Sequence, residues 1–139
     1  MIKNPKRIVA QWIVSQLKNP EKQIQQNWID LTVKSVKHLL SRWHMSEERR
    51  GTPDLWFDNL VWKKLAPGVY SVEFNEYVKI PNGLCAQIHQ RSSINRCWVL
   101  IQAGLYDAWF ENTIWAVMYV INEYWFEVEK DTRLAQIVF

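Results

Sequence analysis

Residues 66–96 read "APGVYSVEFNEYVKIPNGLCAQIHQRSSINR", and this stretch carries the main signals for the fold. Short runs rich in β-branched and aromatic residues alternate with turn formers, first at Pro67-Gly68 and again at Pro81-Asn82-Gly83. This alternation predicts antiparallel strands separated by tight turns. The stretch ends with Arg91 and Arg96 around two adjacent serines, which places two fixed cations and two small hydroxyls at a strand end.

The rest of the chain extends this pattern in both directions. Asn4-Pro5 combines a capping side chain with a proline at the first helical position, so a helix is expected from there to near Asn19-Pro20. Residues 34–50 fit either a helix or an irregular excursion, and residues 51–58 are rich in turn formers. Strands are expected at residues 28–33, 69–74, 77–80, 84–89, 97–101, 113–121, 124–128 and 134–139. The prediction is a mainly β, mostly antiparallel domain with a short N-terminal helix.

Length and composition limit the class of protein. The 139 residues predict a single domain, 1–139, with the helix within residues 1–20 and the β core within residues 67–139. Hydrophobic residues at 48% and charged residues at 22% are typical of a globular protein. No apolar run approaches the roughly 18 residues of a membrane span, and the N-terminus lacks a secretory signal. A cytoplasmic protein with no membrane partner is therefore expected.

Individual residue types exclude further classes. Four glycines, with no two close together, exclude a glycine-rich phosphate loop and a dinucleotide-binding fingerprint. Residues 1–50 carry ten Lys and Arg against four acids, but such charge is usually solvated surface, and nucleic acid is not an expected partner. Nine tryptophans predict packing in the core and at subunit interfaces. Cys85 and Cys97 are expected to be reduced and buried.

Several motifs resemble, in the same order, those of the dCTP deaminases and trimeric dUTPases. Residues 21–33, "EKQIQQNWIDLTV", resemble the family's QIQPxxxDLxL motif, and residues 66–96 resemble its turn, strand, ExVxIP and RSS segments. Residues 102–112, "QAGLYDAWFEN", are similar to TAGFIDPGFxG, and residues 131–139, "DTRLAQIVF", are similar to GDRIAQLVF. Residues 1–12 resemble the first helix of the deaminase branch.

This resemblance implies a β-clip fold, a barrel-like antiparallel arrangement that assembles as a homotrimer with nucleotide sites between subunits. The implied substrate is deoxyuridine or deoxycytidine triphosphate. Mg²⁺ is implied as a cofactor that the nucleotide phosphates carry, with no direct protein ligand. A short, divergent member of this kind suits an archaeal or viral genome, and in the viral case the host cytoplasm.

The resemblance also implies a role for each matching residue. Asp107 matches the dUTPase aspartate that acts as general base on the water attacking the α-phosphorus. Phe110 matches the aromatic residue that packs on the deoxyribose, and Asp30 matches the carboxylate of the first motif, whose role is either catalytic or structural. The phosphates would be held by Arg91, Ser92, Ser93, Arg96 and Gln136, with Arg133 divided between phosphate contact and subunit support, and the base by the hairpin residues Gln102, Ala103 and Gly104.

The chain lacks the acid that the deaminases use. Their catalytic glutamate carries protons to and from the pyrimidine. Its position falls at Val117 when counted from Asp107 and at Tyr119 when counted back from Asn122, and neither residue is acidic. No acid occurs between Thr113 and Asn122, and the spacing of Glu111 places it in the preceding turn. Because metal-free hydrolytic deamination requires that proton carrier, deamination is not expected, although Arg96 matches the deaminases' second arginine.

Three other departures concern the shape of the site. Ala108-Trp109 replaces the usual proline-glycine, and the indole is expected to narrow or fill the pocket. The segment between Arg96 and Asp107 is slightly shorter than in the deaminases, which alters the base-reading hairpin. The chain stops at Phe139 without the family's C-terminal arm, which predicts slower turnover or none.

The sequence leaves three classes of function open. The favoured one is a dUTP diphosphatase that yields dUMP and pyrophosphate. The second is a catalytically silent trimer on the same scaffold, which binds a nucleotide or protein or serves as a structural component. The third and least favoured is a dCTP deaminase. His38, His44 and His89 match no catalytic position.

Overall fold

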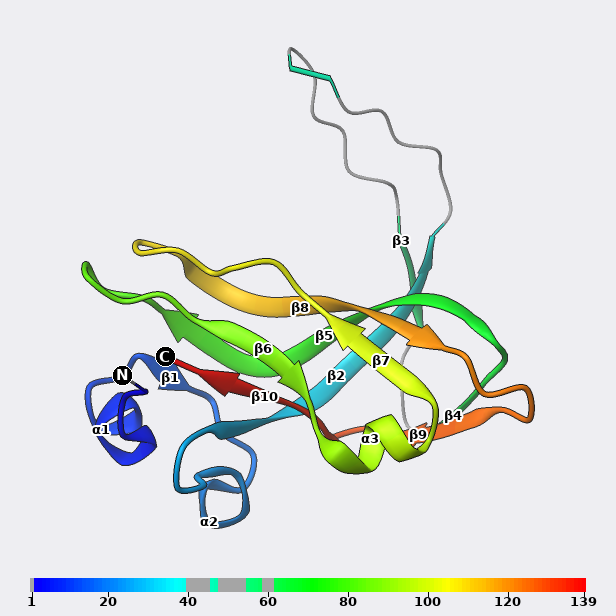
Figure 1. Cartoon of the computed structure of the whole chain (residues 1–139), viewed down its shortest axis with the longest axis horizontal. Coiled ribbons are helices and arrows are strands. Elements are labelled where there is room, and N and C mark those ends of the chain that lie inside the picture. Colours follow the sequence, from blue (N-terminus) through cyan, green and yellow to red (C-terminus); the bar gives the residue numbers. More distant parts are fainter. Residues whose placement is uncertain (1, 40–45, 48–54, 59–61) are drawn as a thin grey trace.

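The computed structural model describes residues 2–39, 46–47, 55–58 and 62–139 (Figure 1). The expectations for residues 40–45 and 48–54, His44 included, lie outside the described residues. Three helices are present: α1 (Pro5–Ala10), α2 (Pro20–Gln23) and α3 (Ser92–Arg96). The strands are β1 (Val14–Ser15), β2 (Ile29–Leu39), β3 (Leu55–Asp58), β4 (Trp62–Leu65), β5 (Gly68–Lys79), β6 (Gln87–Gln90), β7 (Val99–Gln102), β8 (Glu111–Val120), β9 (Phe126–Glu129) and β10 (Arg133–Val138).

Most of the strands join one curved antiparallel sheet. Its order is β6-β10-β2-β5-β8-β7, with β1 added to β5 and β3 added to β2. β4 and β9 form a separate two-stranded sheet. The two ends of the order, β6 and β7, lie against each other, so the large sheet nearly closes into a barrel (Figure 1). This arrangement confirms the predicted mainly β, barrel-like antiparallel fold.

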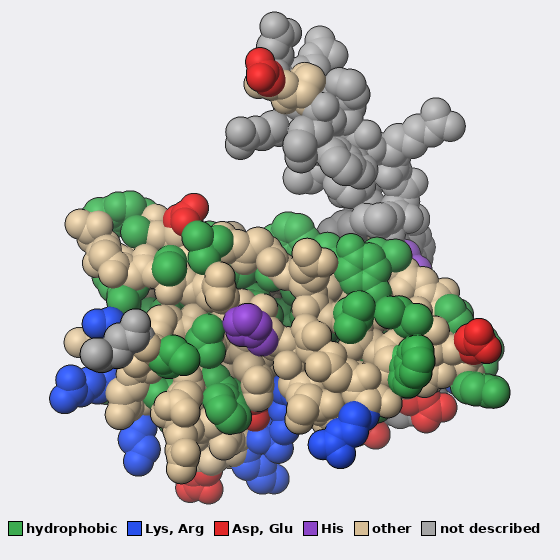
Figure 2. All heavy atoms as spheres, viewed as in Figure 1, with side chains coloured by type: hydrophobic (Ala, Val, Ile, Leu, Met, Phe, Trp, Pro, Cys, Tyr) green, Lys and Arg blue, Asp and Glu red, His purple; other side chains and the backbone are tan. Residues whose placement is uncertain are grey.

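Two-residue alternation along the strands divides the side chains between core and surface. β8 buries every second residue from Ile114 to Val120 and turns Trp115, Val117 and Tyr119 outward. Figure 2 shows apolar side chains on the outer surface among polar ones, while most of the visible Lys and Arg lie along the edge that carries the helices. No helix of the described part is both long and apolar enough to cross a membrane.

Helix α1 begins as predicted but ends early. Asn4 caps the helix by accepting a hydrogen bond from the backbone N–H of Lys6, and a proline follows at the first helical position. Trp12 then adopts a left-handed backbone with φ of 59°, which turns the chain out of the helix. The expected helix is therefore wrong beyond Ala10. Asn19-Pro20 starts the separate helix α2 with the same combination of cap and proline.

Strand β5 replaces two predicted strands, 69–74 and 77–80. The pairing of β5 with β8 shifts register between Glu73 and Tyr77, and this β-bulge lies at the predicted break. The bulge turns Asn75 and Glu76 into the interior, where Glu76 is fully buried. The Glu76 carboxylate accepts hydrogen bonds from the Thr32 N–H at 3.0 Å, the Thr32 hydroxyl at 2.6 Å and the Gln23 amide at 2.7 Å.

Other element boundaries also differ from the expectations. Residues 92–96, expected at a strand end, form α3, and β7 starts at Val99 rather than at residue 97. Residues 34–39 continue β2 and form neither a helix nor an irregular excursion. Residues 55–58, expected within a turn-rich segment, pair with β2 as β3. Strand β4 was not predicted.

The cysteines contradict the expectation of burial, and the described tryptophans contradict the part of the expectation that placed them in the core. Cys85 and Cys97 are both exposed. Every tryptophan whose side chain is described lies at least partly in solvent: Trp28 is half-buried, and Trp12, Trp98, Trp109, Trp115 and Trp125 are each more than half exposed. The described core is therefore built from aliphatic side chains, with Phe and Tyr but without these indoles.

Candidate functional site

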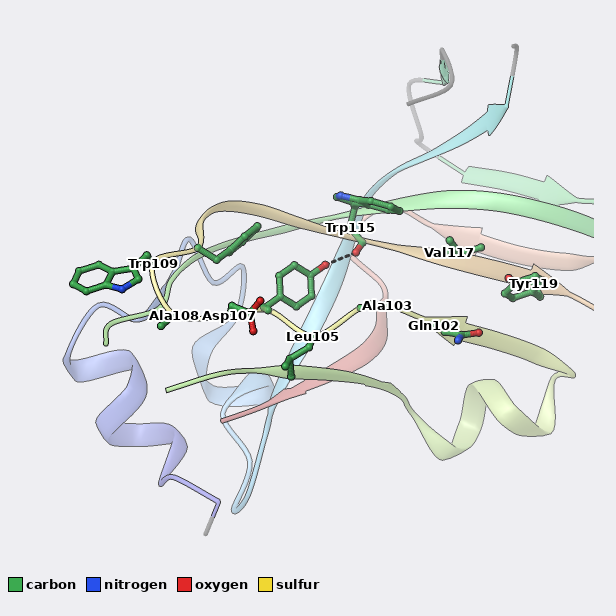
Figure 3. Close-up of a pocket in the computed structure, with 12 residues that line it drawn as sticks. Gln102, Ala103, Leu105, Asp107, Ala108, Trp109, Trp115, Val117 and Tyr119 are labelled. Atoms are coloured by element: carbon green, nitrogen blue, oxygen red, sulfur yellow. Dashed lines mark hydrogen bonds between the residues drawn. The ribbon is translucent and has the colours of Figure 1, made fainter. Parts of the chain in front are cut away.

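A recess of about 760 Å³ lies between strand β8 and the hairpin of residues 102–110. The hairpin supplies one wall, and the outward-facing Trp115, Val117 and Tyr119 supply the other (Figure 3). We call this the hairpin recess. It contains Gln102, Ala103, Gly104, Asp107 and Phe110, so the structure brings together all the residues predicted to contact base, sugar and attacking water.

Tyr106 fixes the hairpin against the sheet. Its backbone exchanges hydrogen bonds of 2.9 and 3.0 Å with Ala86, and its hydroxyl donates to the Trp115 carbonyl at 2.5 Å. Its ring meets Phe110 edge to face, with 4.8 Å between centroids. Burial raises the pKa of Tyr106, so the phenol remains a donor. Tyr106 was not among the residues predicted for the site, and its signal in the sequence is a phenol where the family motif has an aliphatic side chain.

Trp109 lines the recess without filling it. Its N–H donates to the Ile80 carbonyl at 2.8 Å, which holds the turn after Asp107 with φ of 72° at Trp109. The indole is 77% exposed and projects away from the hairpin (Figure 3). The expectation that it fills the pocket is wrong in this chain on its own, because the turn directs the side chain outward.

Acids are scarce in the recess. Asp107 is the only carboxylate among the residues that line it, and Val117 lies where the deaminases' glutamate was expected. Glu111 lies outside the recess. Its carboxylate forms an ion pair with the Lys79 ammonium at 2.9 Å and accepts a hydrogen bond from the Tyr77 hydroxyl at 3.2 Å. Hydrogen bonding from Lys79 holds the pKa of Glu111 below its usual range. Glu111 is thus ionised and engaged elsewhere.

A second group, which we call the arginine cluster, joins Arg91 and Arg133, both predicted to contact phosphate, to the first-motif carboxylate of Asp30. Asp30 is 1% exposed, and its carboxylate lies 3.0 Å from the Arg133 guanidinium and 3.6 Å from that of Arg91. Arg91 also donates to the Arg133 carbonyl at 3.1 Å. The indole N–H of Trp28 donates to Asp30 at 3.1 Å. These contacts indicate that Asp30 positions the two arginines.

The remaining predicted phosphate ligands surround this cluster. Ser92 and Ser93 are exposed in the first turn of α3, directly after Arg91, and Arg96 is exposed at its end. Gln136 lies opposite Asp30 in the pairing of β10 with β2, and its side chain is partly exposed. These residues add a cation, two hydroxyls and an amide on the elements next to the arginine cluster.

Within one chain the two groups stay apart. No member of the arginine cluster, and none of Ser92, Ser93, Arg96 or Gln136, lines the hairpin recess. Figure 3 places Asp107 on the hairpin, at a distance from helix α3. The structure therefore holds two separate groups of predicted site residues, the hairpin recess and the arginine cluster. No group of three or more His, Cys, Asp or Glu side chains among the described residues could hold a metal ion by itself.

Several archaeal proteins are similar to most of this chain. A probable deoxyuridine 5'-triphosphate nucleotidohydrolase of Methanosarcina barkeri is 35% identical over 124 residues, covering 86% of this chain and 72% of that protein. The corresponding protein of Archaeoglobus fulgidus is 32% identical over 122 residues, covering 86% and 73%. A dCTP deaminase, dUMP-forming, of Hydrogenobaculum is 38% identical over 65 residues, only 46% of this chain.

Solved structures and a family comparison agree with these relatives. The dCTP deaminase of Agrobacterium tumefaciens has a TM-score of 0.78 at 18% identity, covering 99% of this chain but 45% of that one. The dUTPase of EIAV has a TM-score of 0.50 at 16% identity, covering 59% and 71%. At these identities the likeness concerns the fold alone. Residues 5–139 match the family described as dCTP deaminase-like, which confirms the resemblance read from the motifs. The chain belongs to the dCTP deaminase-like family.

Proposed function

We propose that this protein is a dUTP diphosphatase, which hydrolyses dUTP to dUMP and pyrophosphate. The observation that carries the proposal is the hairpin recess, in which Asp107 is the single lining carboxylate and Val117 stands where a deaminase needs an acid. A site with one base and no second proton carrier suits activation of a water molecule and not exchange of an amino group. The archaeal relatives named as dUTP nucleotidohydrolases support the same choice.

In the proposed reaction, Asp107 accepts a proton from a water molecule while the oxygen of that water forms a bond to the α-phosphorus. The bond between the α-phosphorus and the bridging oxygen breaks, and pyrophosphate leaves. Phe110, held in place by Tyr106, packs against the deoxyribose, and the backbone of Gln102–Gly104 meets the pyrimidine edge. Asp107 is exposed at the recess and forms no ion pair with another described residue, which suits a base that must meet solvent water.

The proposal requires a second copy of the chain. Arg91, Ser92 and Ser93 would hold the phosphates of a nucleotide whose base lies in the recess of a neighbouring subunit, in a homotrimer. Arginine offers a planar fork of donors to phosphate oxygens, and Asp30 keeps that fork in place. The outward-facing Leu100 and Tyr119 beside the recess provide an apolar surface for such a neighbour.

The donor set also suits a role for Mg²⁺. Because no cluster of three acidic, His or Cys side chains occurs in the described part, most ligands would come from the triphosphate and water, as Mg²⁺ commonly accepts. When bound, the ion would neutralise charge on the phosphates. Asp107 would then accept the proton of the attacking water, and the arginine cluster would bind the remaining phosphate oxygens.

One incubation tests the proposal. The purified protein is mixed with dUTP, dCTP or dTTP and Mg²⁺, and the products are separated by chromatography. We expect dUMP and pyrophosphate from dUTP, with a loss of about 10²–10⁴-fold in rate for Asp107→Asn. Glu111→Gln is the matched control, since Glu111 is a neighbouring acid outside the recess, and it should retain the parent rate.

Other results of the incubation would identify a different function. Conversion of dCTP to a uracil nucleotide would identify a deaminase. Thermal stabilisation by dUTP without any product would identify the second candidate, a silent binding protein on this scaffold.

A further inference from the structure

Exposed tryptophans occupy most of the left-handed positions in the described part of the chain. Six non-glycine residues have positive φ, and four of them are tryptophans: Trp12, Trp98, Trp109 and Trp125. Each of these indoles is more than half exposed. A left-handed backbone is unfavourable for a residue with a Cβ, and an exposed indole keeps a large apolar surface in water. Local strain of this kind tends to persist where a surface has a use.

Two of these tryptophans frame a single groove. Trp12 lies in the turn after α1, where the Ile13 carbonyl accepts the Lys79 N–H at 2.9 Å. Trp109 lies in the turn before β8, where its own N–H donates to the Ile80 carbonyl at 2.8 Å. Two separate turns are thus fastened to consecutive residues at the end of β5. Between them lies a groove of about 760 Å³, which we call the indole groove.

The indole groove carries no net charge. Its only charged side chains are Lys79 and Glu111, and they form an ion pair with 2.9 Å between Nζ and Oε2. A phosphate, an acidic peptide or a nucleic acid backbone would find no unpaired cation there. The charge balance therefore favours a neutral ligand.

Hydrogen-bond donors remain available in the indole groove. Gln11 and Asn82 line it with their amides, and Trp12 and Trp109 add two indole N–H groups. None of these four side chains makes a hydrogen bond to another described residue. A suitable ligand therefore offers flat or ring-shaped apolar groups for the indoles together with carbonyl acceptors for the donors.

The backbone around the groove is already paired. Val78 of β5 pairs with Val14 of β1, and Lys79 pairs with Glu111 of β8, so this end of β5 is paired on both sides. A ligand strand cannot extend the sheet at this point. Recognition must depend on side chains, which suits a segment in the polyproline conformation, since that conformation presents its rings and carbonyls outward without internal hydrogen bonds.

We propose that the indole groove is a docking site for a neutral, proline-rich segment of a partner protein. Proline rings pack on the indoles of Trp12 and Trp109, and the segment's carbonyls accept hydrogen bonds from the indole N–H groups and the amides of Gln11 and Asn82. The inference does not depend on dUTP hydrolysis, because the indole groove shares only Trp109 with the hairpin recess and binding requires no turnover.

Fluorescein-labelled decaproline is the probe, and its fluorescence anisotropy is measured as the full chain is added. We expect saturable binding that is unchanged by added salt, and no binding of a glycine-serine peptide of equal length. Trp12→Ala and Trp109→Gly should each weaken the affinity by about tenfold or more. Trp98→Ala is the matched control, because this exposed, left-handed tryptophan does not line the groove, and it should bind like the parent.

The variants are informative because the fold should survive them. Glycine suits the left-handed turn at residue 109, and melting temperatures identify any variant that has unfolded. The proposal is overturned if decaproline fails to bind, if Trp98→Ala weakens binding as much as Trp12→Ala, or if salt abolishes it. It is also overturned if Trp12→Ala reduces the oligomeric mass in solution, since that result would show that another copy of the chain covers the groove.

Discussion

Trp109 takes a backbone conformation that suits glycine and few other residues. Its φ of 72° lies in the left-handed region, where a Cβ costs about 1–2 kcal/mol. The resembling family motif has a proline-glycine at residues 108–109, so the turn keeps the glycine conformation although the side chain is an indole. The N–H bond to Ile80 holds this conformation in place.

We expect Trp109→Gly to raise the unfolding free energy by up to about 1 kcal/mol, because relief of the left-handed strain exceeds the backbone entropy that glycine adds to the unfolded chain. Urea denaturation followed by circular dichroism measures the change. Trp115→Gly is the matched control: this indole is also exposed but sits in extended β8, so glycine should lower stability by about 0.5–1 kcal/mol. A loss of stability in both variants would contradict the strain at Trp109.

Single residues also mark the limit of what the sequence predicts about the site. The motif at residues 102–112 correctly placed Gln102, Asp107 and Phe110 around one recess. It did not show that Tyr106 fastens the hairpin, because the Trp115 carbonyl that receives its hydroxyl is defined only by the folded sheet. The direction of the Trp109 indole was missed for a similar reason, since it depends on a bond to Ile80.

Strand β5 holds two glutamates three residues apart in opposite electrostatic settings. Burial raises the pKa of Glu76, although hydrogen bonds from Thr32 and Gln23 oppose the shift. Burial would also raise the pKa of Glu73, but hydrogen bonds and positive charge from Lys34 and Lys37 hold it below its usual value of 4.5. Ion pairs of 2.8 and 2.9 Å join Glu73 to these lysines.

These opposite shifts predict opposite pH dependence. Folding makes Glu76 hold its proton more tightly, so its contribution to stability falls as the pH rises from 4.5 through the raised pKa. Folding makes Glu73 release its proton more readily, so its contribution is present above 4.5 and is lost as the pH falls through the lowered pKa. Relative to Glu76→Gln, the parent should therefore become less stable with rising pH, and relative to Glu73→Gln it should become more stable.

Unfolding free energies measured from about pH 3 to pH 7 test both signs, and each glutamine variant serves as the other's control. Global acid effects cancel because each variant is compared with the parent at the same pH. Slopes of the same sign for the two variants would contradict the assignment.

The same strand shows why elements were only partly predictable. The polar pair Asn75-Glu76 interrupts an apolar run, which reads locally as a break between two strands. The structure keeps one strand because Thr32, Gln23 and Asp131, distant in sequence, satisfy the two side chains inside the protein. Helix α3 was missed because five residues are too short to display a helical period.

At the scale of the whole molecule, the separation of the hairpin recess from the arginine cluster leads to a complementation test of the proposed site between subunits. Asp107→Asn damages only the hairpin half, and Arg91→Ala damages only the phosphate half. If each active site combines halves from two subunits, a mixed trimer contains one site in which both residues are intact. Refolding the two inactive variants together in equal amounts should therefore restore about one quarter of the parent activity.

The control mixture combines Arg91→Ala with Ser93→Ala. Both variants damage the phosphate half, so no mixed trimer contains an intact site, and the mixture should be no more active than the two separate proteins. Native mass spectrometry verifies that mixed trimers have formed. Recovery in neither mixture, with mixed trimers present, would place both halves of the site in one chain.

The predictable part of the overall fold was the part that local strand patterns and the order of the motifs along the chain indicate. Alternating patterns predicted a mainly antiparallel domain, and the order of the motifs predicted the family. Strand pairing was not predictable in this way, because the order β6-β10-β2 joins segments far apart in the chain. The two-stranded sheet of β4 and β9 also escaped prediction, since β4 lies where no motif was recognised.

That strand order has a consequence for synthesis on the ribosome. β10 follows every other strand in the chain, yet it lies between β6 and β2. Until it emerges, the nascent chain exposes two unpaired strand edges that antiparallel partners from other molecules can occupy. Completion of the barrel must therefore wait for translation of residues 133–138, and a ribosome that pauses just before them would leave an aggregation-prone intermediate for chaperones to shield.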